Sequence, residues 1–313
     1  MKALAIVVVL TTLAPAADLR IGLVGTDTSH VTAFTKILND PMAPDHVPGA
    51  RVIAAYKGGS PDLPESRDRI EKFTRELQDQ WQVKIVSSID ELARSVDAVL
   101  LTSVDGRVHL SQARAVIAAH KPLFIDKPLA STLEDAREIA RLAKEANVPW
   151  FSSSSLRFGG VSALRTTDLS GALTWGPGPL EEHHHLDLAW YAIHPIEMLY
   201  AIMGTGCEEV TRTSTPDADI ITGRWKDGRI GTVRASRPYS DYGAVVYRKN
   251  PKSQTSEALT KVNDGYAPLV REIVQFFQTG HPPVPNDETL EIFAFMDAAQ
   301  RSKESGGKPA RLR

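Results

Sequence analysis

A lysine that directly follows a short apolar strand is the most informative candidate for chemistry in this sequence. The strand Leu123–Ile125 is followed by Asp126, Lys127 and Pro128, so these residues leave the strand at its carboxyl end, where open α/β sheets bind ligands. Pro128 fixes its own φ and favours an extended conformation for Lys127. We expect Lys127 to point into a site at the sheet edge, although a buried strand with a surface lysine also fits these residues.

A second group of polar side chains surrounds His194, in a segment that we predict to be helical. With a helical repeat, Asp187, Tyr191 and Glu197 share one face with His194. Histidine titrates near neutrality and can therefore transfer protons. The competing interpretation is a histidine that only packs in the core.

The run Glu181–His185 raises the question of a metal site. In a strand, His183 and His185 would share a face, and a nearby carboxylate could complete a ligand set. No HExxH or other established ligand spacing accompanies them. We therefore predict a polar run lining a cleft, with His185 a candidate for substrate binding, and no metal.

Strand-like and helical segments alternate through residues 18–151, which predicts a Rossmann-like, doubly wound parallel sheet. The expected strands are 19–25, 51–56, 83–86, 96–102, 123–125 and 149–151, and the expected helices begin near residues 29, 61, 88, 107 and 133.

From residue 152 to residue 313 the pattern changes to that of an α+β domain with a mainly antiparallel sheet. The segments Ala218–Trp225 and Arg229–Ala235 read as strands joined by a hairpin at Lys226-Asp227-Gly228. The sequence thus predicts an α/β protein of two domains.

The first 17 residues resemble a secretory signal peptide. Lys2 precedes an apolar core that is too short to span a bilayer, and Ala14–Ala17 contains a small-residue cleavage site. A buried first strand is the alternative, but Leu19–Gly25 is the better first strand. We expect export to the periplasm or the exterior by the general secretory (Sec-type) route, with no membrane span after cleavage.

Composition excludes several classes of protein. The formal net charge is −2 with no basic stripe, so nucleic acid is not an expected partner. One cysteine, Cys207, excludes an internal disulfide framework and a cysteine-rich metal site.

The segment from Val96 to Pro128, with its Asp-Lys-Pro end, resembles the glucose–fructose oxidoreductase, inositol dehydrogenase and MocA family (Gfo/Idh/MocA). The resemblance implies a nicotinamide dinucleotide, NAD or NADP, that exchanges hydride with a secondary alcohol of a sugar, cyclitol or glycoside. It also implies that the last helix packs back on the first domain, and it is compatible with a homo-oligomer formed through the open sheet.

The phosphate loop departs from the family pattern. The fingerprint needs three glycines, and here only Gly25 remains in Gly25-Thr26-Asp27-Thr28-Ser29-His30. A carboxylate at Asp27 would oppose a phosphate by about 4 kcal/mol at 4 Å and an effective dielectric near 20. Lys57 stands where relatives have an acid for the adenosine ribose. The cofactor-binding candidates are Gly25, Thr26, Asp27, Ser29, His30, Lys57, Ser103, Val104, His109, Asp126 and Lys127.

The catalytic element also departs. When the helix is aligned on His194, Trp190 occupies the place of the family's aspartate. Asp187 and Tyr191 are the candidates to replace it, and Lys127 and His194 would share removal of the hydroxyl proton. Arg157 and Glu197 are further candidates for substrate contact. Trp175, Tyr239 and Tyr242 are candidates to stack on a sugar face.

Two functions follow from these observations. The first is an oxidoreductase of this family, which outside the cytoplasm would have to recycle its cofactor within each turnover. The alternative is a cofactor-free carbohydrate-binding protein or a redox-neutral glycosidase or lyase, with or without a metal.

Overall fold

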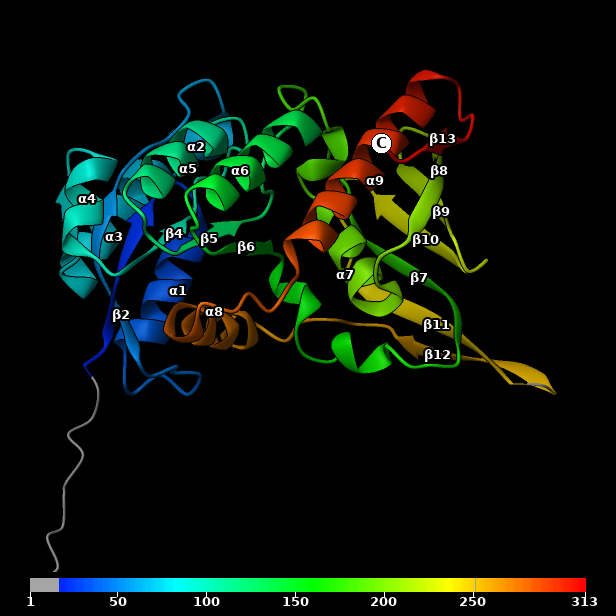
Figure 1. Cartoon of the computed structure of the whole chain (residues 1–313), viewed down its shortest axis with the longest axis horizontal. Helices are drawn as coiled ribbons and strands as arrows, with labels where there is room; N and C mark the ends of the chain where they lie inside the picture. Colours follow the sequence, from blue (N-terminus) through cyan, green and yellow to red (C-terminus); the bar gives the residue numbers. More distant parts are fainter. Residues whose placement is uncertain (1–16, 251) are drawn as a thin grey trace, which may run out of the picture.

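The computed structural model describes residues 17–250 and 252–313. The predicted signal peptide lies outside the described residues, except for its last residue, Ala17. Two domains lie side by side, and the long C-terminal helix runs between them (Figure 1). Among the residues described, no helix is long and apolar enough to cross a membrane.

The first domain holds six parallel strands in the order β3-β2-β1-β4-β5-β6, as predicted. The central strand β1 pairs in parallel with β2 on one side and with β4 on the other. Their bounds are β1 (Leu19–Val24), β2 (Ala50–Tyr56), β3 (Lys84–Val86), β4 (Ala98–Leu101), β5 (Leu123–Asp126) and β6 (Trp150–Ser153).

Capped helices connect these strands. The side chain of Thr132 accepts the Asp135 N–H at 3.0 Å, and Ser88 accepts that of Glu91 at 3.1 Å, so both helices begin where their caps predict. The helices are α1 (Ser29–Asn39), α2 (Pro64–Arg67), α3 (Ile70–Trp81), α4 (Ile89–Ser95), α5 (His109–Ala118) and α6 (Leu133–Glu145).

The single helix expected to begin near residue 61 is wrong, because the structure has two helices in its place, α2 and α3. Pro64 lacks an N–H and begins a separate first turn. Ser66, in that turn, faces inward and bonds the loop that follows β1. The segment before α3 therefore lies over the β1–α1 turn instead of extending the helix.

The second domain is built on a seven-stranded sheet in the order β12-β11-β7-β10-β9-β8-β13. Its pairs are antiparallel except β7 with β10. The predicted hairpin joins β9 and β10, with Gly228 at φ +86 in the turn. The strands are β7 (Leu169–Pro177), β8 (Cys207–Ser214), β9 (Ala218–Trp225), β10 (Ile230–Ser236), β11 (Gly243–Asn250), β12 (Ser253–Leu259) and β13 (Ala310–Arg311).

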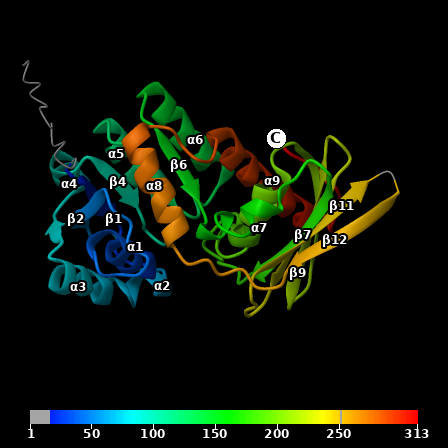
Figure 2. The same ribbon diagram turned by 90° about the horizontal axis from the view of Figure 1, so that it is seen from below.

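Three helices of the C-terminal half join the domains. The helix α7 (Ile193–Met203) packs on β7 and β10, whereas α8 (Ala267–Thr279) returns to the first domain beside α1 (Figure 2). The last helix, α9 (Asn286–Glu304), contacts β8 of the second sheet and also α6 and β6 of the first domain.

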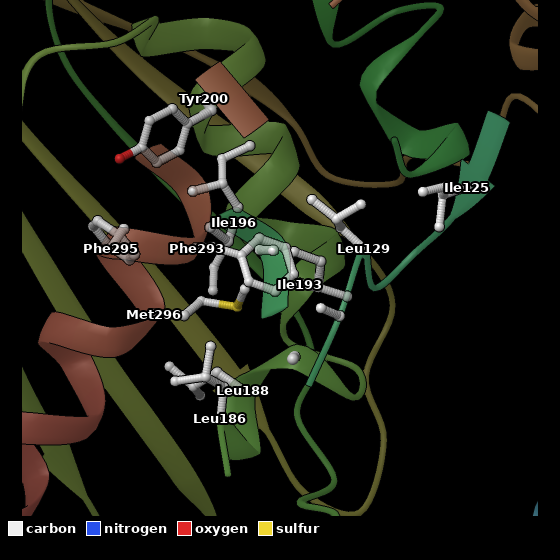
Figure 3. Close-up of a cluster of buried hydrophobic side chains, with 14 of the residues drawn as sticks. Ile125, Leu129, Leu186, Leu188, Ile193, Ile196, Tyr200, Phe293, Phe295 and Met296 are labelled. Carbon is white, nitrogen blue, oxygen red and sulfur yellow. The ribbon is translucent and has the colours of Figure 1, made fainter. Parts of the chain in front are cut away.

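One hydrophobic core continues across the junction of the domains. In Figure 3, Ile193 lies in the middle of this core. Ile125 of β5 and Leu129 lie on one side of it, and Phe293 and Met296 of α9 lie on the other. All these side chains are buried. Because Lys127 lies between Ile125 and Leu129 in the chain, this packing fixes the backbone that carries it.

Candidate functional site

A cavity of about 390 Å³ lies between the domains at the carboxyl edge of the parallel sheet. Its size is within the range of small-molecule sites. The first domain contributes the start of α1 and the end of β5, and the second contributes the start of α7 and two loops. The side chains most relevant to chemistry in its lining are His30, Arg69, Lys127, Tyr191, His194 and Tyr266.

Lys127 faces this cavity, as predicted from its position after β5. Burial lowers the pKa of its ammonium, the charge of Arg69 lowers it further, and Asp126 opposes both effects. Among the residues that the structure describes, Lys127 makes no hydrogen bond or ion pair within the protein. Its charge is therefore available to a ligand.

His194 reaches the same cavity from the first turns of α7. Its Nδ1 lies 2.6 Å from the hydroxyl of Ser154, which follows β6. Burial holds the pKa of His194 well below its usual value, and the charge of Lys127 acts in the same direction. His194 is therefore neutral near pH 7 and can donate or accept a hydrogen bond there.

His30 and Asp126 form a pair at the cavity wall. Nδ1 of His30 lies 2.5 Å from Oδ2 of Asp126, and only 13 % of the histidine side chain is exposed. Burial opposes ionisation of Asp126, but the charge and hydrogen bond of His30 outweigh it and the pKa of the carboxyl is lowered. Asp126, one of the predicted cofactor-binding residues, thus contacts His30.

Aromatic side chains form the opposite wall. Tyr191, Tyr239 and Tyr242, with Trp190, line the cavity. Aromatic faces pack well on the apolar face of a sugar ring, which supports the predicted role of Tyr239 and Tyr242. Trp175, the third predicted stacking residue, lies outside the lining and packs against Gly243.

The β1–α1 turn is closed by the chain itself. Asp27 is fully buried, and its carboxylate accepts the Ser66 hydroxyl at 2.6 Å and the Val104 N–H at 3.0 Å. Burial raises the pKa of Asp27 despite these bonds. A dinucleotide phosphate has no access to this backbone in the described conformation, so the expected contacts of Gly25, Thr26 and Asp27 with phosphate are not present.

Other predicted cofactor residues are also engaged within the protein. Lys57 pairs with Glu71. His109 is fully buried with its Nε2 2.7 Å from the Ser103 carbonyl oxygen, and Ser103 packs against Gly25. The members of the predicted set that reach the cavity are Ser29, His30, Val104 and Lys127.

The expectation that Asp187 acts beside His194 is wrong. Asp187 lies in a short 3-10 helix before α7 rather than on the same helix face, because α7 begins only at Ile193. Its carboxylate is 2.6 Å from Nη1 of Arg212 and 2.6 Å from Nζ of Lys303. Asp187 therefore holds two cations of the second domain, the buried Arg212 and the partly exposed Lys303.

Arg157 and Glu197 lie outside the cavity lining, contrary to their predicted contact with substrate. Nη1 of Arg157 is 3.0 Å from Oε2 of Glu197, and the same guanidinium pairs with Glu288 of α9. All three side chains are at least nine-tenths buried. In this chain Arg157 is therefore part of a buried ion cluster instead of a substrate contact.

The histidine run does not form a strand. His183 bonds Glu181 at 2.5 Å, and both His183 and His185 line a second depression, separate from the cavity of Lys127. His185 is exposed there and makes no contact with that cavity. The described residues contain no group of three or more histidine, cysteine or acidic side chains placed to hold a metal.

Three residues of the cavity lining, Arg69, Lys261 and Tyr266, were not identified from the sequence, and neither was Ser154, which bonds His194 from behind the lining. Ser154 directly follows β6, so its place beyond a strand end was a usable signal. Arg69 and Lys261 come from segments with many other charges. Nothing in the sequence separates them from solvent-exposed residues.

Comparison with known proteins gives matches of two kinds. Residues 20–153 match an oxidoreductase family with an NAD-binding Rossmann fold. A 1,5-anhydro-D-fructose reductase of Ensifer adhaerens is 42 % identical over 76 residues, covering 24 % of this chain and 22 % of the relative. An inositol 2-dehydrogenase of Cereibacter sphaeroides is 35 % identical over 131 residues, covering 41 % of this chain and 33 % of the relative. The matched stretches thus span a third or less of these curated relatives.

Solved structures match along nearly the whole chain. A probable dehydrogenase from Thermotoga maritima superposes with a TM-score of 0.73 at 21 % identity, covering 94 % of this chain and 99 % of the other. A myo-inositol dehydrogenase from Lactobacillus casei, in complex with NAD(H) and myo-inositol, gives 0.71 at 16 % identity, covering 95 % and 97 %. At these identities the likeness concerns the fold of both domains.

Proposed function

We propose that the chain belongs to the Gfo/Idh/MocA oxidoreductase family, whose NAD-binding model matches residues 20–153, and that it oxidises or reduces a sugar, cyclitol or glycoside with a nicotinamide dinucleotide. The family is one of NAD-binding Rossmann proteins, as predicted. The observation that carries the proposal is the meeting of Lys127 and His194, from different domains, in one cavity at the carboxyl edge of the sheet.

The two side chains have complementary properties for this chemistry. A hydroxyl that loses hydride from its carbon must also lose its proton, and the carbonyl oxygen that forms gains partial negative charge in the transition state. The ammonium of Lys127 is placed to stabilise that charge in a site of low dielectric. Neutral His194 is placed to hydrogen-bond the same oxygen. The nicotinamide ring, when bound, supplies the hydride acceptor.

The cavity fits one end of a dinucleotide better than the other. Val104 and Lys127 are placed to hold the nicotinamide end, and Ser29 at the start of α1 and the cation Arg69 are placed to hold a phosphate. The buried Asp27 turn offers nothing to the pyrophosphate. We therefore expect weak dinucleotide binding, with phosphates nearer to Arg69 than the fingerprint would place them. Calorimetry with both dinucleotides decides between NAD and NADP.

The polar and aromatic lining favours a polyhydroxylated ring as substrate. The names of the relatives, an inositol dehydrogenase and an anhydrofructose reductase, provide the first compounds to test.

The test combines binding and turnover. Calorimetry with NAD⁺, NADH, NADP⁺ and NADPH measures affinity, and the absorbance of reduced nicotinamide follows turnover of myo-inositol and 1,5-anhydro-D-fructose. Lys127→Ala should lower kcat by roughly 10²-fold or more, because charge stabilisation in the transition state is lost. Lys84→Ala, a surface lysine paired with Glu91, is the matched control. Unchanged kcat in Lys127→Ala contradicts the assignment.

A redox-neutral glycosidase or lyase, or a carbohydrate-binding protein, is the second candidate. The closure of the β1–α1 turn over Asp27 favours it. This candidate predicts no dinucleotide binding at millimolar concentration together with binding of a sugar in the cavity. A dinucleotide that binds and is reduced by substrate excludes it.

We also propose that the protein is exported, from the pattern of its first residues, and that it self-associates, from the family resemblance. The basic start and apolar core of residues 1–17 favour a secretory signal, which N-terminal sequencing of the secreted protein tests. For an exported enzyme we expect the cofactor to stay bound to the protein and to be recycled within each turnover. A homo-oligomer through the open face of the second sheet is tested by light scattering.

A further inference from the structure

We propose that His30, held by Asp126, is the proton acceptor of this cavity and a third catalytic residue beside Lys127 and His194. The inference rests on the proposed oxidoreductase function, because it assigns the hydroxyl proton of that reaction to one atom, Nε2 of His30.

The geometry leaves a free base facing the cavity. Nδ1 of His30 lies 2.5 Å from the Asp126 carboxylate, so this nitrogen carries a proton, and in the neutral imidazole Nε2 then holds the lone pair. Over residues 17–250 and 252–313, Nε2 has no hydrogen-bond partner in the protein, and the side chain lines the cavity. A histidine with one nitrogen fixed on a carboxylate and the other free has the arrangement of a general base.

The ring is held firmly in this orientation. Phe34 stacks on it with ring centroids 5.5 Å apart, and Tyr266 approaches it edge-on at 4.8 Å. Asp126 is itself 97 % buried at the end of β5. Both partners therefore stand on regular elements of the first domain, α1 and β5, and the pair needs no ligand to form.

Electrostatics favour His30 over His194 as the group that accepts the proton. An imidazolium at His30 would be neutralised by Asp126, as a carboxylate stabilises a protonated histidine in other proton-transfer pairs. An imidazolium at His194 would have only the neutral hydroxyl of Ser154 as partner and would lie near the charge of Lys127. His194 is thus better suited to orient the substrate oxygen.

The pair also explains two departures from the family pattern together. Trp190 occupies the place of the aspartate that relatives carry before the helical histidine. His30 occupies the place of the third fingerprint glycine. In this chain the carboxylate–histidine pair is formed on the opposite wall of the cavity, from residues that the family uses for other purposes.

The proton balance is simple. A bound nicotinamide dinucleotide would accept the electron pair of the C–H bond as hydride, and the O–H proton of the same carbon's hydroxyl would pass to Nε2 of His30 as the carbonyl forms. The imidazolium returns the proton to the product alcohol in the reverse reaction, or to solvent after release of the ketone.

Other charged and titratable groups also face the cavity and contribute equally to the wild type and to variants at the pair. They are Glu65, Arg69, Lys127, Tyr191, His194, Tyr239, Asp241, Tyr242, Lys261 and Tyr266. Comparing variants with the wild type therefore isolates the effect of the His30–Asp126 pair.

The experiment follows kcat and kcat/KM against pH for the protein with myo-inositol or 1,5-anhydro-D-fructose and whichever dinucleotide, NAD(H) or NADP(H), calorimetry shows to bind. His30→Ala should lower kcat by about 10²-fold or more, and added imidazole should restore part of it. Asp126→Asn should move the acid limb of the kcat/KM profile to lower pH, because His30 is easier to deprotonate without the carboxylate. His183→Ala removes a histidine with the same bond to a carboxylate, Glu181 at 2.5 Å, outside the cavity, and should change neither.

Two results would overturn the proposal: a kcat of His30→Ala within about threefold of the wild type, or an acid limb that stays in place in Asp126→Asn. Thermal unfolding is followed for each variant, and His30→Gln, which keeps a side chain without a basic nitrogen, replaces His30→Ala if the latter does not fold.

Failure of the proposed function is recognised separately. If the wild type turns over neither compound, nitrogen NMR of histidine-labelled protein still tests the pair, with His30→Gln to assign the signal. An Nε2 that is unprotonated at neutral pH, with a titration that moves to lower pH in Asp126→Asn, supports the pair as a base. An Nε2 that carries the proton, or a titration that does not move, overturns it.

Discussion

At the scale of single residues, the histidines of this chain differ in the hydrogen-bond partner of the imidazole. His30 is backed by a carboxylate, His194 by a hydroxyl, and His109 by carbonyl oxygens within the core. Burial lowers the pKa of both His194 and His109. The same residue type therefore serves as a base, as a neutral hydrogen-bonding group and as a structural residue.

The buried histidines predict how stability depends on pH. Their folded-state pKa values lie below the unfolded value, so the unfolded state binds more protons as the pH falls below about 6.5. The free energy of unfolding should then decrease by up to about 1.4 kcal/mol per pH unit for each such histidine. His194→Gln should reduce this slope by one proton in urea titrations from pH 7 to pH 5. His281→Gln, at an exposed position, should leave the slope unchanged, and an unchanged slope in His194→Gln would show that its imidazole titrates normally.

At the scale of elements, the β1–α1 turn is the feature that separates this chain from its family pattern. The side chain of Asp27 occupies the space over the turn, and Ser66 of α2 lies against it. Gly25, at φ +90, lets Ser103 approach to a distance that a Cβ would forbid. The turn is thus packed by its own chain on two sides.

Restoring the second glycine should improve dinucleotide binding. Asp27→Gly removes both the buried carboxylate and its volume, and we expect NAD(H) or NADP(H) affinity to rise by at least about tenfold, given a repulsion near 4 kcal/mol between close unit charges. Asp27→Asn removes the charge but keeps the volume, so the comparison separates repulsion from occlusion. Calorimetry measures both. Equal affinity in all three proteins would mean that the dinucleotide does not approach this turn.

At the scale of the whole molecule, buried polar clusters tie the two domains together beside the shared hydrophobic core. Asp105, after β4, accepts hydrogen bonds from Arg107 of its own loop and from His184 of the second domain, the latter at 3.1 Å. Within the second domain, Arg157 holds Glu197 of α7 and Glu288 of α9, the helix that also contacts α6 and β6 of the first domain. Such ties hold the cavity walls, which come from both domains, in a fixed relation.

Removing the central cation of the Arg157 cluster should destabilise the protein strongly. Arg157→Met leaves Glu197 and Glu288 buried without a cation, at an expected cost of about 3–5 kcal/mol. Burial already raises the pKa of Glu197 against the effect of Arg157, so the loss should be largest at neutral pH and smaller in acid, where the carboxyls protonate. Denaturant unfolding at several pH values checks this.

The triple variant Arg157→Met, Glu197→Gln, Glu288→Gln is the control, because it removes the buried charges together. It should recover most of the lost stability and show no such pH dependence. A single variant as stable as the wild type would show that the cluster is solvated.

The architecture, the family resemblance of residues 20–153 and the lysine at the sheet edge all follow from the sequence alone. Hydrophobic periodicity and helix caps are local signals, and strand, helix and turn residues lie close together in the chain. For the same reason Lys127 could be placed from Pro128 and the strand before it, and the departures at Asp27 and Trp190 were visible as breaks in a pattern.

Only the tertiary structure decided which polar residues share a site. His30 and Asp126 are 96 residues apart, and Arg157 meets Glu197 and Glu288 across three elements, so no spacing along the chain could pair them. Asp187 was misassigned because the helix of His194 begins later than its pattern suggested. Contacts between distant segments depend on how the domains pack, and that packing is set by the whole core rather than by any segment of the sequence.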